Sequence, residues 1–134
     1  MSSLSILVVD DDSAILELIA QVLIDEGYDV ITAGDGRTAI SRAHAHAPVL
    51  ILLDLMMPEM NGWQVIAELK AIETTRMIPV ILLSARRDLA QAAAYLGATA
   101  YLEKPFDLDD LVQHVQMYVA SEGQPNAKEN HTST

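Results

Sequence analysis

The sequence contains no cysteine, and it has only 8 lysine and arginine residues against 19 aspartate and glutamate residues. Without cysteine there is no disulfide framework and no thiolate metal site, which is typical of a cytoplasmic protein. The formal net charge of −11 argues against direct binding of nucleic acid or of an anionic membrane surface. Both kinds of binding depend on basic side chains that neutralise phosphate groups.

Long hydrophobic runs are also absent. No apolar stretch approaches the roughly 20 residues that a helix needs to cross a bilayer. The first residues, Met1–Ser5, lack the basic start of a signal peptide. We therefore expect a cytoplasmic protein that does not enter a membrane. The chain has 134 residues, 51% of them hydrophobic, which is enough for one domain with a buried core.

Short apolar runs alternate with segments that have the period of an amphipathic helix. Strands are predicted at residues 6–9, 29–33, 49–53, 80–83 and 99–102. Helices are predicted at residues 13–26, 35–46, 63–70, 89–96 and 108–119. This alternation predicts an α/β fold: a doubly wound, five-stranded parallel sheet in the order 2-1-3-4-5, flanked by five helices, as in flavodoxin.

Residues 4–120 are predicted to form this domain. The strand order places its second and fifth strands at the edges of the sheet, which agrees with their being less apolar than the central strands. Residues 121–134 have no apolar periodicity and are rich in Gly, Pro, Asn, Ser and Thr. We expect this segment to be a disordered C-terminal tail.

Four of the predicted strands end at polar residues of the kind that phosphoryl chemistry uses. In chain order these residues are Asp10, Asp11, Asp12, Asp54, Ser84 and Lys104. In open α/β sheets, ligands bind beyond the carboxyl ends of the strands, where the strand order reverses. We therefore expect a site at this rim. Asp12 is the exception, because it is better placed to cap the first helix.

The expected neighbours Asp10, Asp11 and Asp54 would repel one another, and a hard divalent cation such as Mg²⁺ would relieve that repulsion. Lys104 and Ser84 could then contact phosphoryl oxygens. Asp54 is central, so it is the natural nucleophile for an acyl phosphate. Each residue alone could belong to an ordinary turn or solvated loop. Their joint position at strand ends favours a site.

Five short motifs lie at or near these residues. They are Ile6–Asp11, Leu53–Pro58, Asn61-Gly62, Leu83–Ala85 and Gly97–Phe106. In these motifs the chain resembles the receiver domain of two-component response regulators, the chemotaxis-regulator-like (CheY-like) family. The resemblance covers roughly residues 4 to 120, and the motifs taken together are highly specific.

The resemblance implies that Asp54 accepts a phosphoryl group from a phosphohistidine of a sensor histidine kinase or a histidine phosphotransfer protein. It implies that Mg²⁺ is held by Asp10, Asp11, Asp54 and the backbone carbonyl of Met56. Lys104 would pair with the phosphoryl group.

The resemblance also implies a switch. Ser84 would move toward the new phosphoryl oxygens, and Tyr101 would turn inward behind it. This would reshape the surface formed by the fourth helix, the fifth strand and the fifth helix. The small Ala85 side chain would leave access to the phosphorylation site open. The peptide bond before Pro105 would be cis. The alternative for Tyr101 is that its side chain packs permanently at the edge of the sheet and does not move.

The implied function is that of a single-domain response regulator in two-component signalling or a phosphorelay. Such a protein is a phosphoacceptor module rather than an enzyme, and it acts by binding a downstream protein. A receiver excised from a longer regulator or hybrid kinase is a variant of this interpretation.

Two other classes of protein fit these residues less well. A haloacid-dehalogenase-like phosphatase needs an acid two residues after its nucleophile, where this chain has Met56. A flavin-binding module would need polar phosphate loops after the first strand, where Asp10, Asp11 and Asp12 would repel phosphate.

Met56 and Arg86 are at positions that vary among receivers and flank the expected site. A bulky Met56 and a cationic Arg86 are expected to hinder the hydrolytic water. We therefore predict a long-lived phosphoryl group on Asp54.

Overall fold

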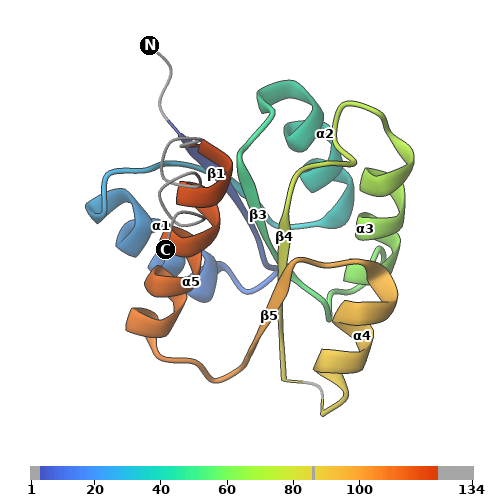
Figure 1. The fold of residues 1–134 in the computed structure, drawn as a ribbon. Coiled ribbons are helices and arrows are strands. Elements are labelled where there is room, and N and C mark those ends of the chain that lie inside the picture. The colour runs from blue at the N-terminus through green and yellow to red at the C-terminus, as the bar shows by residue number, and fades with distance from the viewer. Residues whose placement is uncertain (1–3, 86, 124–134) are drawn as a thin grey trace, which may run out of the picture.

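The computed structural model describes residues 4–85 and 87–123. Five parallel strands form one sheet in the order β2-β1-β3-β4-β5 (Figure 1). The strands are β1 (Ser5–Val9), β2 (Asp29–Ala33), β3 (Leu50–Asp54), β4 (Val80–Ser84) and β5 (Ala100–Glu103). The helices are α1 (Ser13–Asp25), α2 (Gly36–His46), α3 (Gly62–Ala71), α4 (Leu89–Leu96) and α5 (Leu108–Gly123). The predicted fold and strand order are confirmed.

Two apolar cores lie on the two faces of the sheet. Helices α1 and α5 cover one face, and α2, α3 and α4 cover the other (Figure 1). Successive strand residues point to opposite faces, so Ile6 and Val8 pack under α1 and α5, while Leu7 and Val9 pack under the other helices. Strand β3 is therefore buried at every position, whereas the edge strands β2 and β5 are partly exposed.

The beginnings of α1 and α2 are fixed by side chains that accept backbone hydrogen bonds. The Asp12 carboxylate accepts hydrogen bonds from the backbone N–H groups of Ala14 and Ile15. Asp12 therefore caps α1, as predicted. The Asp35 carboxylate caps α2 in the same way, and its hydrogen bonds from Thr38 lower the pKa of Asp35.

Strand limits differ from the predictions by one residue. Strand β3 starts at Leu50 and includes Asp54, and β5 covers Ala100–Glu103 rather than 99–102. Because β3 includes Asp54, this site residue is held in the β ladder, opposite Leu83. The Lys104-Pro105 bond is cis, as the resemblance implied.

Helix α5 continues to Gly123, three residues into the segment predicted as a tail. The rest of that segment, residues 124–134, and also Arg86, lie outside the described residues. Of the helices in the described ranges, none combines the length and hydrophobicity needed to span a bilayer.

Candidate functional site

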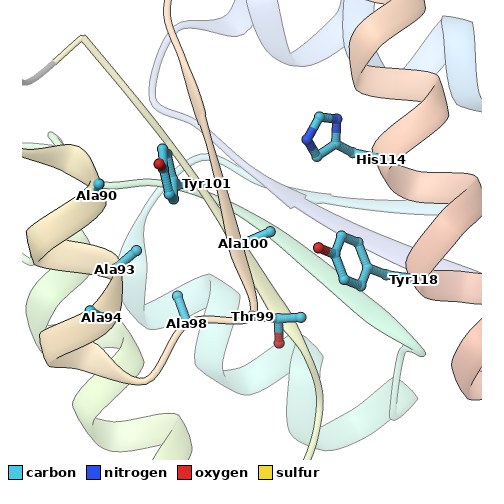
Figure 2. A pocket seen from close by; sticks show the side chains of 9 residues that line it. All are labelled: Ala90, Ala93, Ala94, Ala98, Thr99, Ala100, Tyr101, His114 and Tyr118. Carbon is cyan, nitrogen blue, oxygen red and sulfur yellow. The ribbon is translucent and has the colours of Figure 1, made fainter.

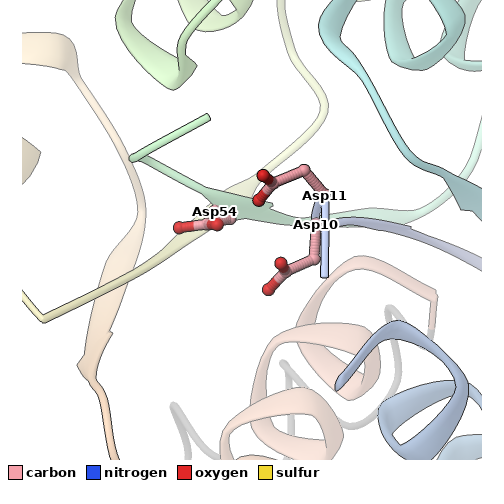
Figure 3. A group of neighbouring side chains, drawn as sticks. All are labelled: Asp10, Asp11 and Asp54. Carbon is pink, nitrogen blue, oxygen red and sulfur yellow. The ribbon is translucent and has the colours of Figure 1, made fainter. Parts of the chain in front are cut away.

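Three carboxylates meet at the carboxyl end of the sheet, where the strand order reverses. Asp10 and Asp11 follow β1, and Asp54 ends the neighbouring strand β3 (Figure 3). One oxygen from each carboxylate lies within 4.8 Å of the others. Asp10 and Asp54 are buried and Asp11 is exposed. The register pairs Val9 with Leu53, and this brings the following aspartates together.

Lys104 lies against this cluster from the turn after β5. Its Nζ is 2.9 Å from Oδ2 of Asp10 and 3.6 Å from Oδ2 of Asp54. The Lys104 backbone N–H also donates to the carbonyl of Ser84 at 2.8 Å, which fastens the end of β5 to the end of β4. The ammonium thus partly compensates the repulsion between two buried carboxylates.

Backbone donors orient the two buried carboxylates. The Met56 N–H donates to Oδ1 of Asp54 at 3.1 Å, and the Asp12 N–H donates to Oδ1 of Asp10 at 2.9 Å. The second oxygen of each carboxylate faces Lys104. Both carboxyl groups are therefore held in one orientation.

The charges leave Asp54 easy to protonate. Burial and the nearby Asp10 carboxylate raise the pKa of Asp54 from 3.8 to about 6, although Lys104 and the Met56 N–H act in the opposite direction. Burial lowers the pKa of Lys104, but its hydrogen bond to Asp10 and the charge of Asp54 outweigh burial, so the Lys104 pKa is raised overall. The site therefore holds more negative charge than one lysine balances.

The turn after Asp54 depends on Gly62. A Cβ at this glycine would lie 2.7 Å from the Cα of Leu55 and 3.0 Å from the carbonyl oxygen of Asp54. The Gly62 N–H donates to the Leu55 carbonyl at 2.9 Å. The sequence analysis included Asn61-Gly62 among the motifs but did not find this role. The signal was the glycine directly after a helix-capping residue, Asn61.

Ser84 is also at the rim, whereas Tyr101 is not. Ser84 is buried at the end of β4, next to β3. The Tyr101 side chain is 43% exposed and lines a hollow between α4 and α5 on the outer side of β5 (Figure 2). The inward position that the resemblance implied for a phosphorylated state is therefore not the one seen here.

The donor set fits a hard divalent cation. Three carboxylates offer oxygen ligands only, and Mg²⁺ prefers such ligands while keeping several waters. The three carboxylates outnumber the single Lys104 ammonium beside them, and after burial the Asp10 charge is the next cause of the raised pKa of Asp54. Among the described residues, Asp10, Asp11 and Asp54 are thus the group that could hold Mg²⁺.

Replacing Asp54 by asparagine is expected to stabilise the metal-free protein above pH 7 by about 2–3 kcal/mol. Between pH 3.8 and about 6 the folded protein holds a proton on Asp54 that the unfolded chain has lost. Stability therefore falls as pH rises through this window, and the substitution removes the loss. Urea unfolding in EDTA should show the gain at pH 7.5 and little gain at pH 3.5. An equal gain at both values would contradict this.

Residues 6–116 match the family model of the response regulator receiver domain. The chain belongs to the response regulator receiver family. Receiver domains of two-component systems are signalling modules that are phosphorylated, bind Mg²⁺ at an acidic pocket, and interact with histidine kinases and downstream targets.

Curated relatives agree with this assignment. The receiver is 34% identical over 132 residues to the transcriptional regulatory protein PdtaR of Mycobacterium tuberculosis, covering 96% of this chain and 63% of that protein. It is 40% identical over 113 residues to the DNA-binding response regulator MtrA of Mycobacterium leprae, covering 83% and 49% respectively. The chain thus spans less than two thirds of the length of these relatives.

Solved receiver structures share the fold. The signal receiver domain of a putative LuxO repressor from Vibrio parahaemolyticus superposes with a TM-score of 0.83 at 29% identity, over 96% of this chain and 98% of that one. The chemotaxis protein CheY4 of Vibrio cholerae gives 0.81 at 29% identity, over 87% and 99%.

Proposed function

We propose that this receiver accepts a phosphoryl group on Asp54 from a phosphohistidine of a sensor histidine kinase or a histidine phosphotransfer protein. The observation that carries the proposal is the buried Asp54 carboxylate, held by the Met56 N–H and lying 3.6 Å from the Lys104 ammonium. Residues 4–120 would form the receiver domain, acting in the cytoplasm in two-component signalling or a phosphorelay.

In the proposed transfer, a carboxylate oxygen of Asp54 attacks the phosphorus atom. The P–N bond of the phosphohistidine breaks, its electron pair stays on the imidazole, and an acyl phosphate forms on Asp54. The Lys104 ammonium, which lies close to Asp54, would contact the incoming phosphoryl oxygens and stabilise their negative charge.

Mg²⁺, when bound, would supply positive charge that neutralises the carboxylates and the phosphoryl oxygens. Asp10, Asp11, Asp54 and the backbone carbonyl of Met56 would hold it, and the grouping of the three carboxylates supports this set. The function of Asp10 and Asp11 is then to keep that charge beside Asp54.

Ser84 and Tyr101 are proposed as the switch. The new phosphoryl group brings about −1.5 to −2 charges and three acceptor oxygens, and the Ser84 hydroxyl at the neighbouring strand end could donate to one of them. Tyr101 is partly exposed on β5 and would turn inward when Ser84 moves. The change would alter the surface over α4, β5 and α5, where a downstream protein binds.

An apolar hollow beside the site offers a place for the donor. It is about 510 Å³ in volume and opens next to the ammonium that contacts Asp54. Its lining residues are Ile15, Leu18, Ile19, Ala85, Lys104, Pro105, Phe106 and Leu108. A protein seated there would have its phosphohistidine within reach of the acidic rim.

Replacing Met56 by asparagine is expected to speed loss of the phosphoryl group by about tenfold. The Met56 side chain is 53% exposed two residues after Asp54, where a bulky apolar group excludes the water that hydrolyses the acyl phosphate. General acid–base catalysis by a positioned side chain is worth about 10²- to 10⁴-fold, and an asparagine amide, which can orient the water but does not take its proton, is expected to contribute less. The decay of the phosphorylated mass measures the rate; a fast wild-type decay that Met56→Asn leaves unchanged would contradict this. Arg86, the other flanking residue, lies outside the described part of the chain.

The proposed function is tested with acetyl phosphate, which needs no donor protein. The chain is incubated with acetyl phosphate and Mg²⁺, and its intact mass is measured. We expect one added phosphoryl group in the wild type and none in Asp54→Asn. No gain, or an equal gain in the variant, would refute the assignment.

A further inference from the structure

All the sulfur of this chain is in thioethers, because the sequence has 6 methionines and no cysteine. Two-electron oxidants such as peroxides react with sulfur, either with cysteine thiolates or with methionine thioethers. In this chain no thiolate competes for the oxidant. The response of the protein to a peroxide therefore depends on which thioethers are exposed and on what lies beside them.

The methionines of the loop after Asp54 differ in exposure. The Met56 side chain is 53% exposed, whereas that of Met57 is 7% exposed and belongs to the same core as Leu55. Met60 is half-buried against that core. A peroxide in solvent can thus reach the Met56 sulfur, while the core shields the sulfur of the next residue in the chain.

Met56 is also held beside the carboxylate that would carry the phosphoryl group. Its backbone N–H donates to Oδ1 of Asp54 at 3.1 Å, so this end of the loop is fixed to the site. Two other methionines of the described residues are exposed, but they lie elsewhere. Met77 precedes β4, at the opposite end of the sheet, and Met117 is in the second half of α5. Among the described residues, Met56 is therefore the exposed thioether that adjoins the site.

We propose that Met56 is an oxidation site that controls the lifetime of the phosphoryl group on Asp54. The sulfur lone pair attacks one oxygen of hydrogen peroxide and the O–O bond breaks. The proton on the transferred oxygen passes to the leaving hydroxide, which gives a sulfoxide and water. The sulfur loses two electrons and the peroxide gains them. The inference rests on the proposed function, because the lifetime is that of an acyl phosphate on Asp54.

Oxidation reverses the character of the Met56 side chain. The thioether is apolar and excludes the water that hydrolyses the acyl phosphate, whereas the sulfoxide is polar. Its oxygen accepts a hydrogen bond from a water molecule and leaves the water oxygen free to attack phosphorus. The sulfoxide oxygen and Oε1 of glutamine are the same number of bonds from Cα, so Met56→Gln places a similar acceptor there without an oxidant. Either change is expected to speed loss of the phosphoryl group about tenfold.

Brief treatment with hydrogen peroxide tests the accessibility of the sulfur atoms. The reaction is stopped with free methionine, and peptide mass spectrometry locates the added oxygen. Met56, Met77 and Met117 should be oxidised before Met57, because only their sulfur atoms are open to solvent. Oxidation of Met57 ahead of Met56 would overturn the proposal.

The decay of the phosphorylated mass tests the effect on lifetime. Each protein is labelled with acetyl phosphate and Mg²⁺, with and without prior oxidation, and the decay rate after oxidation is divided by the rate before it. This ratio should be about tenfold in the wild type and in the matched controls Met77→Leu and Met117→Leu. Oxidation should not change the rate in Met56→Leu or in Met56→Gln, and Met56→Gln should decay as fast as the oxidised wild type.

Methionine sulfoxide reductases, one for each sulfoxide epimer, together with a thiol reductant should restore slow decay to the oxidised wild type. A tenfold acceleration that persists in Met56→Leu would overturn the proposal. So would a wild type that is labelled but decays at one rate with and without the Met56 sulfoxide; in that case Asp54 would remain the acceptor. A wild type that gains no phosphoryl mass before oxidation would instead refute the proposed function, and this inference with it.

Discussion

Replacing Lys104 by glutamine is expected to slow phosphorylation of Asp54 by acetyl phosphate on the order of a hundredfold. The Lys104 ammonium lies 2.9 Å from Asp10 and 3.6 Å from Asp54, so it is the side-chain cation beside the carboxylate that meets the phosphoryl group. Glutamine retains most of the length of the side chain and can still donate a hydrogen bond, but it lacks the positive charge. The initial rate of the mass gain at saturating Mg²⁺ measures the effect.

The matched control is Lys70→Gln. Lys70 is an exposed lysine on α3 whose Nζ contacts the backbone carbonyl of Arg76, so its loss should leave the rate within about twofold, in line with the small effects of exposed charges. Thermal unfolding with Mg²⁺ verifies that both variants are folded. A Lys104→Gln rate equal to that of Lys70→Gln would show that the ammonium has no part in the transfer.

Replacing Asp11 by asparagine is expected to weaken Mg²⁺ binding on the order of a hundredfold, because removing one carboxylate from a small oxygen-ligand site removes a full ligand charge. Asp11 is the exposed member of the cluster, and the Lys104 ammonium forms ion pairs with Asp10 and Asp54. Its substitution therefore changes the metal site while those ion pairs remain. Isothermal titration calorimetry gives the dissociation constants.

Asp12→Asn is the control for this prediction. Asp12 is the next residue in the chain, but its carboxylate caps α1, and asparagine caps a helix about as well as aspartate. Both variants lose one negative charge, so a difference between them reports ligation rather than net charge. Equal weakening in the two variants would contradict the assignment of Asp11 to the metal site.

The fold could be predicted because the apolar pattern changes with the number of faces that each strand buries. Every residue of β3 is buried, and its sequence is apolar until Asp54, while β2 contains Asp29 and Thr32 and lies at an edge. Short connections and right-handed crossovers then left few strand orders. Limits were one residue wrong at β1, β3, β4 and β5, because the β ladder can include a polar residue such as Asp54 or Ser84 at the end of an apolar run.

The grouping of Asp10, Asp11 and Asp54 could be predicted because parallel strand ends share one rim. The closeness of Lys104 to Asp10 could not, since the length and rotamer of a lysine do not follow from strand order. The approach of Gly62 to Leu55 and the hollow beside Leu18 depend on how helices pack on the sheet, which spacing alone does not specify. The outward position of Tyr101 could not be predicted either, because the strand pattern does not specify which of its possible orientations a half-exposed side chain on an edge strand adopts.

We propose that the phosphoryl group is carried by Asp54 and by no other carboxylate of the cluster. Borohydride reduces an acyl phosphate to an alcohol, so the phosphorylated aspartate is converted to homoserine, and peptide mass spectrometry locates it. After treatment with acetyl phosphate and Mg²⁺ we predict homoserine at position 54 and unchanged aspartate at positions 10 and 11. Homoserine at position 10 or 11, or none in a protein that has gained phosphoryl mass, would contradict the account.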